Sequence, residues 1–242
     1  FFLSLIKKIT KFYTNHKIIN IDILSIKKIL NILDTNNIKN IIFAGSIKRP
    51  GIKDLGFDLQ TFLLAKNLFL EKKGDNHLLI SLKKYFESKG YIFFNWTNYC
   101  KELFSIEKYY TKIKPTKKAI LNLNKAKTIY QIYKKLDVGQ SIIVQNQLVL
   151  GMEALEGTDE LIRRCEKYKR KGDNGILFKF SKKNQSNLID IPLIGLNTVM
   201  NLKKYNYEGI YLQKNKCLIM DKAKIIDYAN KNKLFVSSVE LN

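Results

Sequence analysis

The sequence predicts an α/β protein of two domains, in which short buried strands alternate with amphipathic helices. The apolar run NIIFAG (40–45) is typical of a strand buried on both faces of a parallel sheet. Residues 21–33 carry apolar side chains at helical spacing. The best linker candidate, YYTKIKPTKK (109–118), places a proline in a polar run. We therefore predict a Rossmann-like N-terminal domain at residues 1–113 and a C-terminal α/β catalytic domain at residues 114–242.

The elements of the N-terminal domain follow from its apolar runs and breakers. We expect FFLSLIKKITKF to begin as a buried strand, because its apolar part precedes its basic part, the reverse of a signal peptide. The first helix–strand unit lacks the strand and glycine loop that usually open it, so we expect that the given chain starts late. The following elements are then a helix over 21–33, a strand over 40–45, a helix over 58–73, a helix with Asp75 as N-cap, and a strand over 91–94.

The second domain is also predicted to alternate helices and strands. SIIV and LVL, separated by QNQ, indicate a hairpin. TDELIRRCEKYKRKG indicates a helix with Thr158 as N-cap. The predicted order is a helix over 120–136, strands over 141–144 and 148–150, a helix from 158, a strand over 175–181, a helix over 195–205, strands over 209–213 and 217–220, a helix over 221–233, and a strand over 234–238.

Composition excludes several classes of protein. No apolar stretch is long and uncharged enough to cross a bilayer. The three cysteines, Cys100, Cys165 and Cys217, are scattered, which argues against a disulfide framework and fits a reducing compartment. His16 and His77 are the only histidines, so a Cys/His zinc site is excluded, and any metal would be a hard cation held by carboxylates and phosphate.

The net charge of +22 comes mainly from lysines spread along a chain rich in Ile and Asn. This pattern favours compositional bias over a nucleic-acid footprint, although the positive field would attract an anionic ligand or membrane surface. An arginine is informative where lysine is the default cation, because its planar fork binds phosphate or carboxylate in bidentate fashion. The arginines are Arg49, Arg163, Arg164 and Arg170.

The first candidate segment is FAGSIKRP, where a strand ends at Gly45 and two cations, Lys48 and Arg49, follow. Backbone amides after the strand and these cations could hold a phosphate. A surface loop ended by proline explains the same residues equally well.

The second candidate segment is GQSIIVQNQLVLGMEALEGTDELIRR (139–164), which is unusually acidic for this chain. Glu153, Glu156 and Asp159 recur every three residues near a strand-to-helix turn, where Gly157 allows a tight bend. Helix capping would explain the acids after Gly157, but it does not explain Glu153 and Glu156, which precede the helix. Acids at the end of a strand favour a site.

The third candidate segment surrounds Asp190, which lies between two isoleucines. Lys179 and Lys182 precede it, and Gly195 and Thr198 follow at a predicted helix start. A carboxylate among apolar neighbours with cations nearby is a candidate metal ligand or general base. The alternative is an aspartate that only starts a turn before the next proline.

These motifs together carry a family resemblance. LDVGQ, EALEGTD, IRR and DIPLIG, in this order, resemble the LpxI-type UDP-2,3-diacylglucosamine pyrophosphatases of lipid A biosynthesis in Gram-negative bacteria. NNIKNIIFAGSIKRP and GDNHLL resemble the N-terminal half of that family. The resemblance runs from about residue 36 to the end of the chain.

The resemblance implies Mg²⁺-assisted hydrolysis of UDP-2,3-diacylglucosamine to UMP and 2,3-diacylglucosamine 1-phosphate. It implies a catalytic aspartate in the segment that holds Asp190. Residues from all three segments then become candidates for particular roles. The candidate metal ligands are Glu153, Glu156, Asp159 and Asp190, and the candidate substrate-binding residues are Gly45, Lys48, Arg49, Thr158, Arg163, Lys179, Lys182, Gln185, Gly195 and Thr198.

One departure from the family pattern lies just before Asp190. The family usually has Lys-Pro-x-Gln-Asp-x-Arg there, whereas this chain has Lys183, Ser186 and Leu188 in place of the proline, the acid and the arginine. A nucleotide-sugar-binding protein without catalysis is therefore an alternative function, and a basic nucleic-acid-binding protein is a more distant one. We expect the substrate as a partner, no nucleic acid, a cytoplasmic location at the inner-membrane surface, and either a monomer or a homodimer.

Overall fold

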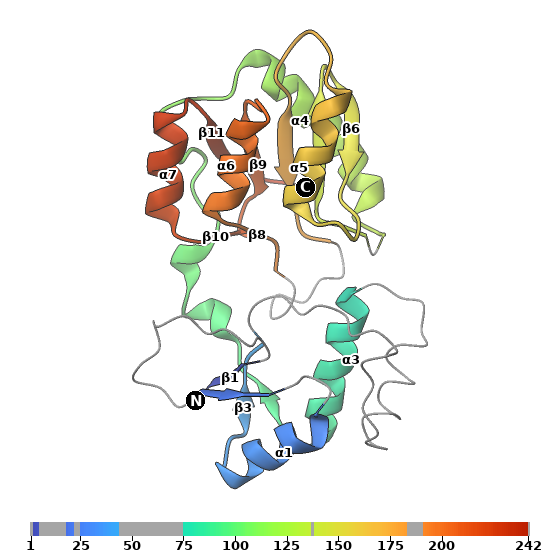
Figure 1. Cartoon of the computed structure of the whole chain (residues 1–242), viewed down its shortest axis with the longest axis vertical. Coiled ribbons are helices and arrows are strands. Elements are labelled where there is room, and N and C mark those ends of the chain that lie inside the picture. The colour runs from blue at the N-terminus through green and yellow to red at the C-terminus, as the bar shows by residue number, and fades with distance from the viewer. Residues whose placement is uncertain are drawn as a thin grey trace. The chain divides into compact units, whose positions relative to one another are not determined.

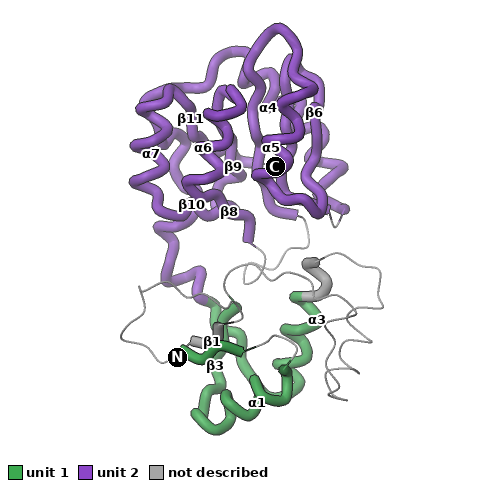
Figure 2. The backbone as a smooth tube through the Cα atoms, viewed as in Figure 1, with its two compact units in different colours: residues 1–95 green, residues 96–242 purple. Residues whose placement is uncertain are grey.

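The computed structural model divides the chain into two compact units, residues 1–95 and residues 96–242 (Figure 2). No helix among the described residues is long and apolar enough to span a membrane. The structure describes residues 2–4, 18–21, 25–43, 75–136, 138–182 and 191–241.

The first unit contains two pairs of parallel strands and two helices among its described residues. Strand β1 (Phe2–Ser4) pairs with β2 (Ile18–Asn20), and β3 (Asn40–Ile41) pairs with β4 (Ile92–Phe93). Helix α1 (Ile26–Thr35) precedes β3, and helix α3 (Asp75–Ser88) precedes β4. The core of this unit is formed by Ile21, Ile26, Ile29, Leu33, Leu82, Phe86 and Tyr91.

The strand and helix predictions for this unit are confirmed in type where the structure describes them, but the bounds differ. Strand β2 was missed, so a strand does stand before α1. The predicted helix over 58–73 and the loop with Gly45, Lys48 and Arg49 lie outside the described residues. Helix α3 begins at Asp75 itself.

The second unit is built on one mixed sheet of five strands in the order β11-β9-β7-β5-β6 (Figure 1). Strands β7, β9 and β11 are parallel, whereas β5 is antiparallel to both β7 and β6. The predicted hairpin is therefore confirmed as β5–β6. The bounds are β5 (Ser141–Gln145), β6 (Leu148–Met152), β7 (Ile176–Lys179), β9 (Gly209–Gln213) and β11 (Phe235–Val239).

Both faces of this sheet are covered by helices. Alternate residues of the strands point to opposite faces, so Leu177 belongs to one core cluster and Phe178 to the other. The first cluster includes side chains of α5 (Thr158–Cys165), α6 (Leu196–Lys204) and α7 (Lys222–Lys231). The second cluster includes side chains of α4 (Lys117–Tyr133). Covering both faces explains why the strands are continuous apolar runs.

Short elements complete this unit. Strands β8 (Leu193–Ile194) and β10 (Leu218–Ile219) form a separate parallel pair. The predicted strand over 217–220 therefore exists, but it belongs to this pair and not to the main sheet. The 3₁₀ turns are η3 (Trp96–Asn98), η4 (Lys101–Leu103) and η5 (Glu166–Tyr168).

The division between the units falls earlier than the predicted boundary after residue 113. The segment between residue 96 and α4 bonds to the rest of the second unit: the Tyr110 amide donates to the Val236 carbonyl of β11 at 3.0 Å, and the Ser105 amide donates to the Cys217 carbonyl before β10 at 2.8 Å. Pro115 therefore marks the start of α4, whose N-cap is Thr116, and not the boundary. A polar run with a proline is compatible with either role, and only long-range backbone pairing distinguishes them.

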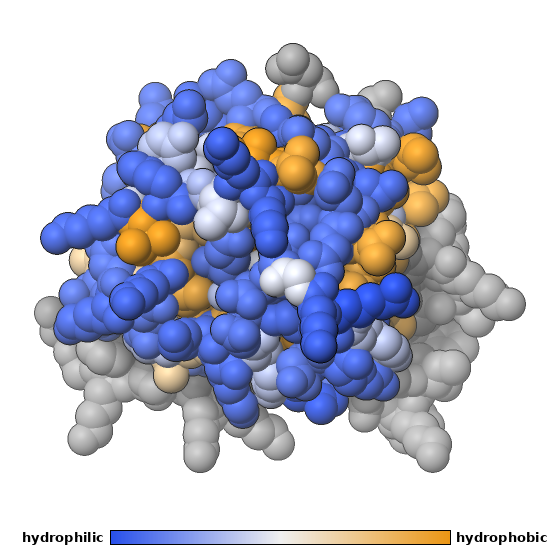
Figure 3. Space-filling model, turned by 90° about the horizontal axis from the view of Figure 1, so that it is seen from above, coloured by the Kyte–Doolittle hydropathy of each residue, from blue (hydrophilic) through white to orange (hydrophobic). Residues whose placement is uncertain are grey.

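The surface agrees with the charge of the chain. On the face seen in Figure 3, apolar side chains stand singly or in small groups within a largely hydrophilic surface. This arrangement is ordinary for a globular protein and carries no functional signal by itself.

Candidate functional site

A buried polar cluster lies at the carboxyl end of β7. Lys179 is the last residue of β7, and its antiparallel partner Ser141 is the first residue of β5. Glu153 follows the last residue of β6, and Thr158 is the first residue of α5. The ends of three adjoining strands, β7, β5 and β6, and the start of α5 thus bring four polar side chains together.

The four side chains form a connected network of hydrogen bonds. The Lys179 Nζ donates to Thr158 Oγ1 at 2.5 Å and to Ser141 Oγ at 3.3 Å. The Thr158 hydroxyl donates to Glu153 Oε1 at 3.1 Å. Lys179 Nζ also lies 3.8 Å from Glu153 Oε2, and the two side chains are only 5% and 11% exposed. A cation and a carboxylate are therefore held together away from water, which requires that each compensates the other.

The backbone around Glu153 fixes this carboxylate. The Glu153 amide donates to the Ser141 carbonyl at 2.9 Å, and the Gly139 amide donates to the Glu153 carbonyl at 3.0 Å. The Gln140 amide donates to Glu153 Oε2 at 3.1 Å. A Cβ at Gly139 would overlap Glu153, so this position needs glycine. The loop before β5 and the end of β6 therefore hold the acid in one place.

Tyr133, at the end of α4, closes the network from the other face of the sheet. Its hydroxyl donates to the Glu153 carbonyl. Burial raises the pKa of Tyr133 to about 12, so the hydroxyl stays protonated at neutral pH and remains a donor.

The start of α5 differs from its prediction. Gly157, with φ at 81°, occupies the N-cap position, and Thr158 is the first helical residue. The left-handed φ is accessible to glycine, which explains the bend expected there. The prediction of Thr158 as N-cap is therefore wrong by one residue, and its hydroxyl bonds Glu153 and Lys179.

Asp159 and Thr198 join the starts of two helices beside the cluster. The Thr198 hydroxyl donates to Asp159 Oδ1 at 2.9 Å. Thr198 lies in the first turn of α6, which has Gly195 at its N-cap position. Two helix starts, with their positive dipole ends, therefore lie next to the polar cluster, an arrangement that favours negative charge.

Glu156 and Arg164 form a pair that closes the loop between β6 and α5. Arg164 Nη2 lies 2.8 Å from Glu156 Oε1 and also donates to the Met152 carbonyl at 2.8 Å. Partial burial alone would raise the pKa of Glu156, but backbone amides and Arg164 hold the pKa below its ordinary value. The Glu156 carboxylate thus binds an arginine in this structure, and its role as a metal ligand stays a prediction.

Arg163 pairs with Glu160 and not with the buried polar cluster. Its guanidinium pairs with Glu160, three residues earlier on the exposed side of α5, with Nε at 2.7 Å from Oε2. The structure therefore gives Arg163 a helix-surface ion pair, whereas the sequence suggested a phosphate contact. Lys182 Nζ donates to the Val138 carbonyl at 2.9 Å.

The predicted residues thus separate into three groups. Glu153, Thr158 and Lys179 are brought together, with the Asp159–Thr198 pair and Gly195 in the adjoining helix starts. Glu156, Arg163 and Lys182 face other partners. The remaining candidates, Gly45, Lys48, Arg49, Gln185 and Asp190, lie outside the described residues.

Sequence reasoning missed Ser141 and Tyr133. Ser141 is fully buried in an apolar strand and supplies its hydroxyl to Lys179. Ser141 lies opposite Lys179 because of the register of the antiparallel pair β5–β7, and the sequence of a single strand does not determine its register.

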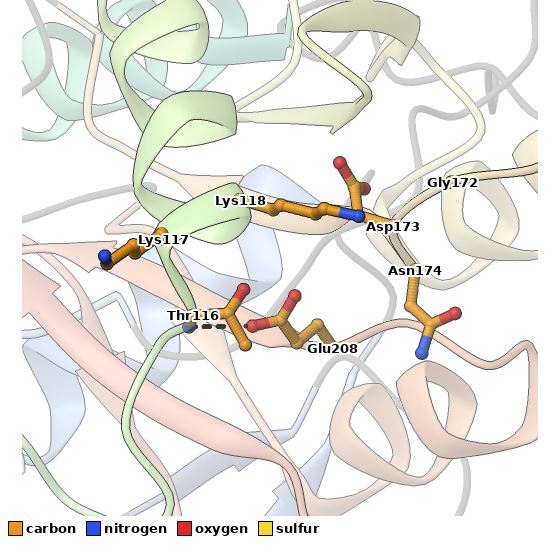
Figure 4. A pocket seen from close by; sticks show the side chains of 7 residues that line it. All are labelled: Thr116, Lys117, Lys118, Gly172, Asp173, Asn174 and Glu208. Carbon is orange, nitrogen blue, oxygen red and sulfur yellow. Dashed lines mark hydrogen bonds between the residues drawn. The ribbon is translucent and has the colours of Figure 1, made fainter.

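A shallow hollow lies at the amino ends of β7 and β9, and both of its acidic side chains, Asp173 and Glu208, accept from backbone amides (Figure 4). Glu208 Oε1 accepts from the Thr116 amide at 2.9 Å, before α4. Asp173 accepts from the Asn146 amide at 3.0 Å and from the Gly175 amide at 2.8 Å. These contacts are those of turns and helix ends, so the carboxyl end of β7 is the stronger candidate site.

Known proteins are similar to this chain over most of its length. The family model described as LpxI N-terminal domain matches residues 2–103, and the one described as LpxI C-terminal domain matches residues 107–237. A Caulobacter vibrioides protein named UDP-2,3-diacylglucosamine pyrophosphatase LpxI is 28% identical over 220 residues, which covers 88% of this chain and 79% of that protein.

Proposed function

Because the chain belongs to the LpxI family, we propose that it is an enzyme that hydrolyses the pyrophosphate of UDP-2,3-diacylglucosamine. The products are UMP and 2,3-diacylglucosamine 1-phosphate. The observation that carries this proposal is that both domain models match in order, together with the pyrophosphatase relative that aligns over 88% of the chain.

The chemistry of the second unit supports the proposal. Pyrophosphate cleavage needs positive charge and hydrogen-bond donors near phosphoryl oxygens. Thr158, Lys179 and the starts of α5 and α6 gather at one edge of the sheet. Ligands of open α/β sheets bind beyond the carboxyl ends of parallel strands, which is where this cluster lies.

Asp190 is the residue that we propose as the catalytic carboxylate, which would accept a proton from the attacking water. It follows β7 in the sequence and lies outside the described residues. Its position in the apolar run LIDIPLIG motivates this role. An ionised carboxylate among apolar neighbours costs free energy unless a cation or a metal pairs with it, so such a residue is more often functional than structural.

Magnesium is the cofactor that we propose, but the described carboxylates alone do not fit it. No group of three or more His, Cys, Asp or Glu side chains gathers as a metal-ligand set within the described ranges. Glu153 is compensated by Lys179, and Glu156 binds Arg164. A magnesium site would therefore depend on Asp190, with Asp159 and substrate phosphates as further oxygen ligands, and we derive no step through the ion.

The test is release of UMP from UDP-2,3-diacylglucosamine by the full chain, with Mg²⁺ and with a chelator. We expect turnover that the chelator abolishes. Absence of UMP above the background of a reaction without protein, for a chain that melts cooperatively, would contradict the proposed activity. UMP release that survives the chelator would contradict the metal requirement alone.

A nucleotide-sugar-binding protein without catalysis is the second candidate. Lys183, Ser186 and Leu188, at positions where the family usually has a proline, an acid and an arginine, favour it. It predicts that the chain binds the substrate in calorimetry while no UMP appears. The third candidate, a nucleic-acid-binding protein, predicts salt-sensitive retention on DNA or RNA and no such substrate binding.

Because the substrate carries two acyl chains, we propose that the enzyme works at the cytoplasmic surface of the inner membrane. A monomer and a homodimer remain alternatives, which sedimentation would distinguish.

A further inference from the structure

The most exposed aliphatic side chains of the second unit gather at one place beside the candidate site. Among its described residues, Leu155, Ile132 and Leu136 lead with 91%, 69% and 52% of their surface exposed. Val138 and Met152 are exposed beside them in sequence. We call these five residues the apolar rim: Ile132, Leu136, Val138, Met152 and Leu155.

The rim comes from two segments that contact each other. One segment is the end of α4 and the connection to β5, and the other is the end of β6 and the loop to α5 (Figure 1). The Gly139 amide donates to the Glu153 carbonyl at 3.0 Å, and the Gln140 amide donates to the Glu153 carboxylate at 3.1 Å. Tyr133, next to Ile132, also bonds the Glu153 carbonyl. The two segments are therefore held in register by the same residue that anchors the buried cluster.

The loop that carries Leu155 is held in an ordered shape. Arg164 binds both the Glu156 carboxylate and the Met152 carbonyl, so it ties the two ends of the loop to α5. The Ala154 amide donates to Glu156 Oε2 at 3.1 Å. A single exposed leucine is ordinary, but this braced loop adds Leu155 to four other exposed apolar side chains on two segments that contact each other. A group of this kind favours a docking surface.

The charges around the rim select the partner. Lys134 and Lys135 stand between Ile132 and Leu136, and Lys182 bonds the Val138 carbonyl. Glu156, the residue after Leu155, is paired with Arg164, and Asp137, which follows Leu136 in the sequence, lies outside the described residues. The chain as a whole carries +22. Apolar tips flanked by lysines suit a negatively charged lipid surface, because the tips enter the boundary of the acyl chains while the ammonium groups meet the headgroups.

We infer that the apolar rim docks the second unit onto an anionic lipid bilayer, with Leu155 and Leu136 as its main inserting side chains. The inference rests on the proposed function only for its motivation, because an enzyme that acts on a diacylated substrate needs access to a bilayer. Docking itself requires no catalysis. The rim also places the bilayer next to the edge of the sheet that carries Lys179 and Thr158.

The test is co-sedimentation of the full chain with vesicles that contain no substrate. One set contains phosphatidylglycerol and phosphatidylcholine, and the other contains phosphatidylcholine alone. We expect binding to the anionic set, and a loss of at least about tenfold in that binding for the double variant Leu136→Glu/Leu155→Glu, because charge replaces the inserting apolar area. Leu155→Ser, which adds no charge, should lose binding in the same direction by less.

Leu148→Glu is the matched control. Leu148 is 49% exposed and lies at the opposite end of β6 from Met152, so it has the same chemistry away from the rim. Its variant should bind the anionic vesicles like the unaltered chain. Thermal melts check that each variant is folded, and UMP release from detergent-dispersed substrate should be unchanged in all of them.

Several outcomes would overturn the inference. Equal binding by the rim variants and the unaltered chain would leave only diffuse attraction by lysines. Equal losses in Leu148→Glu and the rim variants would remove the special role of the rim. Self-association that the rim variants abolish in the absence of lipid would assign the rim to a second copy of the chain. Failure of UMP release affects none of these readouts, so the two proposals fail separately.

Discussion

The two ends of the second sheet both carry connected polar side chains, but these side chains satisfy different partners. At the amino ends of β7 and β9, Asp173 accepts from the Asn146 and Gly175 amides, so a side chain serves the backbone of turns. At the carboxyl end of β7, Lys179, Thr158 and Glu153 serve one another and are withdrawn from water. An arrangement of the first kind stabilises local turns, whereas the second depends on every member being present.

This difference bears on where function lies. A buried ion pair is often no more stable than apolar residues of the same size, so stability alone does not account for Lys179 and Glu153. Turn-satisfying side chains need no such explanation. The comparison therefore favours the carboxyl end as the site that we propose, and the variants below test it in order of decreasing effect.

The largest effect is expected for Asp190→Ala, on turnover. Loss of a general base commonly lowers a rate by about a hundredfold to ten-thousandfold. The fold and substrate binding should remain, because removing an ionised side chain from an apolar run relieves a cost. Single-turnover UMP release at saturating substrate, paired with a thermal melt, measures both quantities.

Asp173→Ala is the matched control at the amino end and should turn over normally. A lower melting temperature for Asp190→Ala would mark that residue as structural. Normal turnover in the same variant would remove Asp190 from the site and leave Asp159 as the carboxylate to test.

The next effect is on stability and concerns Lys179→Met. The change leaves the Glu153 carboxylate buried without its cation, which should lower the free energy of unfolding by about 3–5 kcal/mol. The double variant Lys179→Met/Glu153→Gln removes both charges and should recover most of that loss. Urea unfolding of the single and double variants measures the coupling between the two residues.

Lys118→Met, at the exposed amino end, is the control and should change the free energy of unfolding by less than about 0.5 kcal/mol. If Lys179→Met were as mild as Lys118→Met, the contrast between the two ends of the sheet would disappear.

Asp173→Ala should have a smaller effect on stability than Lys179→Met. It removes the acceptor of the Asn146 and Gly175 amides, and of the Asn122 side-chain amide at 3.0 Å. We expect a loss of about 1–3 kcal/mol, because partly buried donors lose their partner but water can reach some of them. Urea unfolding again gives the value, and a loss that exceeds that of Lys179→Met would reverse the proposed ranking.

The smallest effect concerns the pH dependence of Glu156. Its pKa is lowered in the folded state, so the pair with Arg164 contributes stability above the unfolded pKa and loses it as the pH falls through the folded pKa. The melting temperature of the unaltered chain should exceed that of Glu156→Gln at pH 7, and the gap should close as the pH falls from about 5 to about 3. A gap that stays constant over this range would show that the carboxylate charge is unimportant to the loop.

Some of this protein follows from local sequence. The alternation of apolar runs and helical periodicity predicted an α/β fold, and the hairpin of β5 and β6 was predicted from two apolar runs with a polar turn between them. The family also followed from short sequence motifs, because EALEGTD and DIPLIG resemble those of the LpxI family, and the domain matches confirm that family. These features depend on residues that are close together in the sequence, so they can be predicted without knowing the tertiary contacts.

Other features depend on which strands and loops lie side by side, and only the tertiary structure determines this. Glu156 and Arg163 look like ligands in the sequence, yet Glu156 pairs with Arg164 in a partly buried loop and Arg163 pairs with Glu160 on the exposed side of α5. Ser141 looks like an ordinary strand residue, yet antiparallel register sets it beside Lys179. Lys179 itself is one lysine among many in the printed sequence. Its burial at the end of a central strand, beside Glu153 and Thr158, separates it from the lysines that coat the surface, because charge is kept from water only where packed neighbours compensate it.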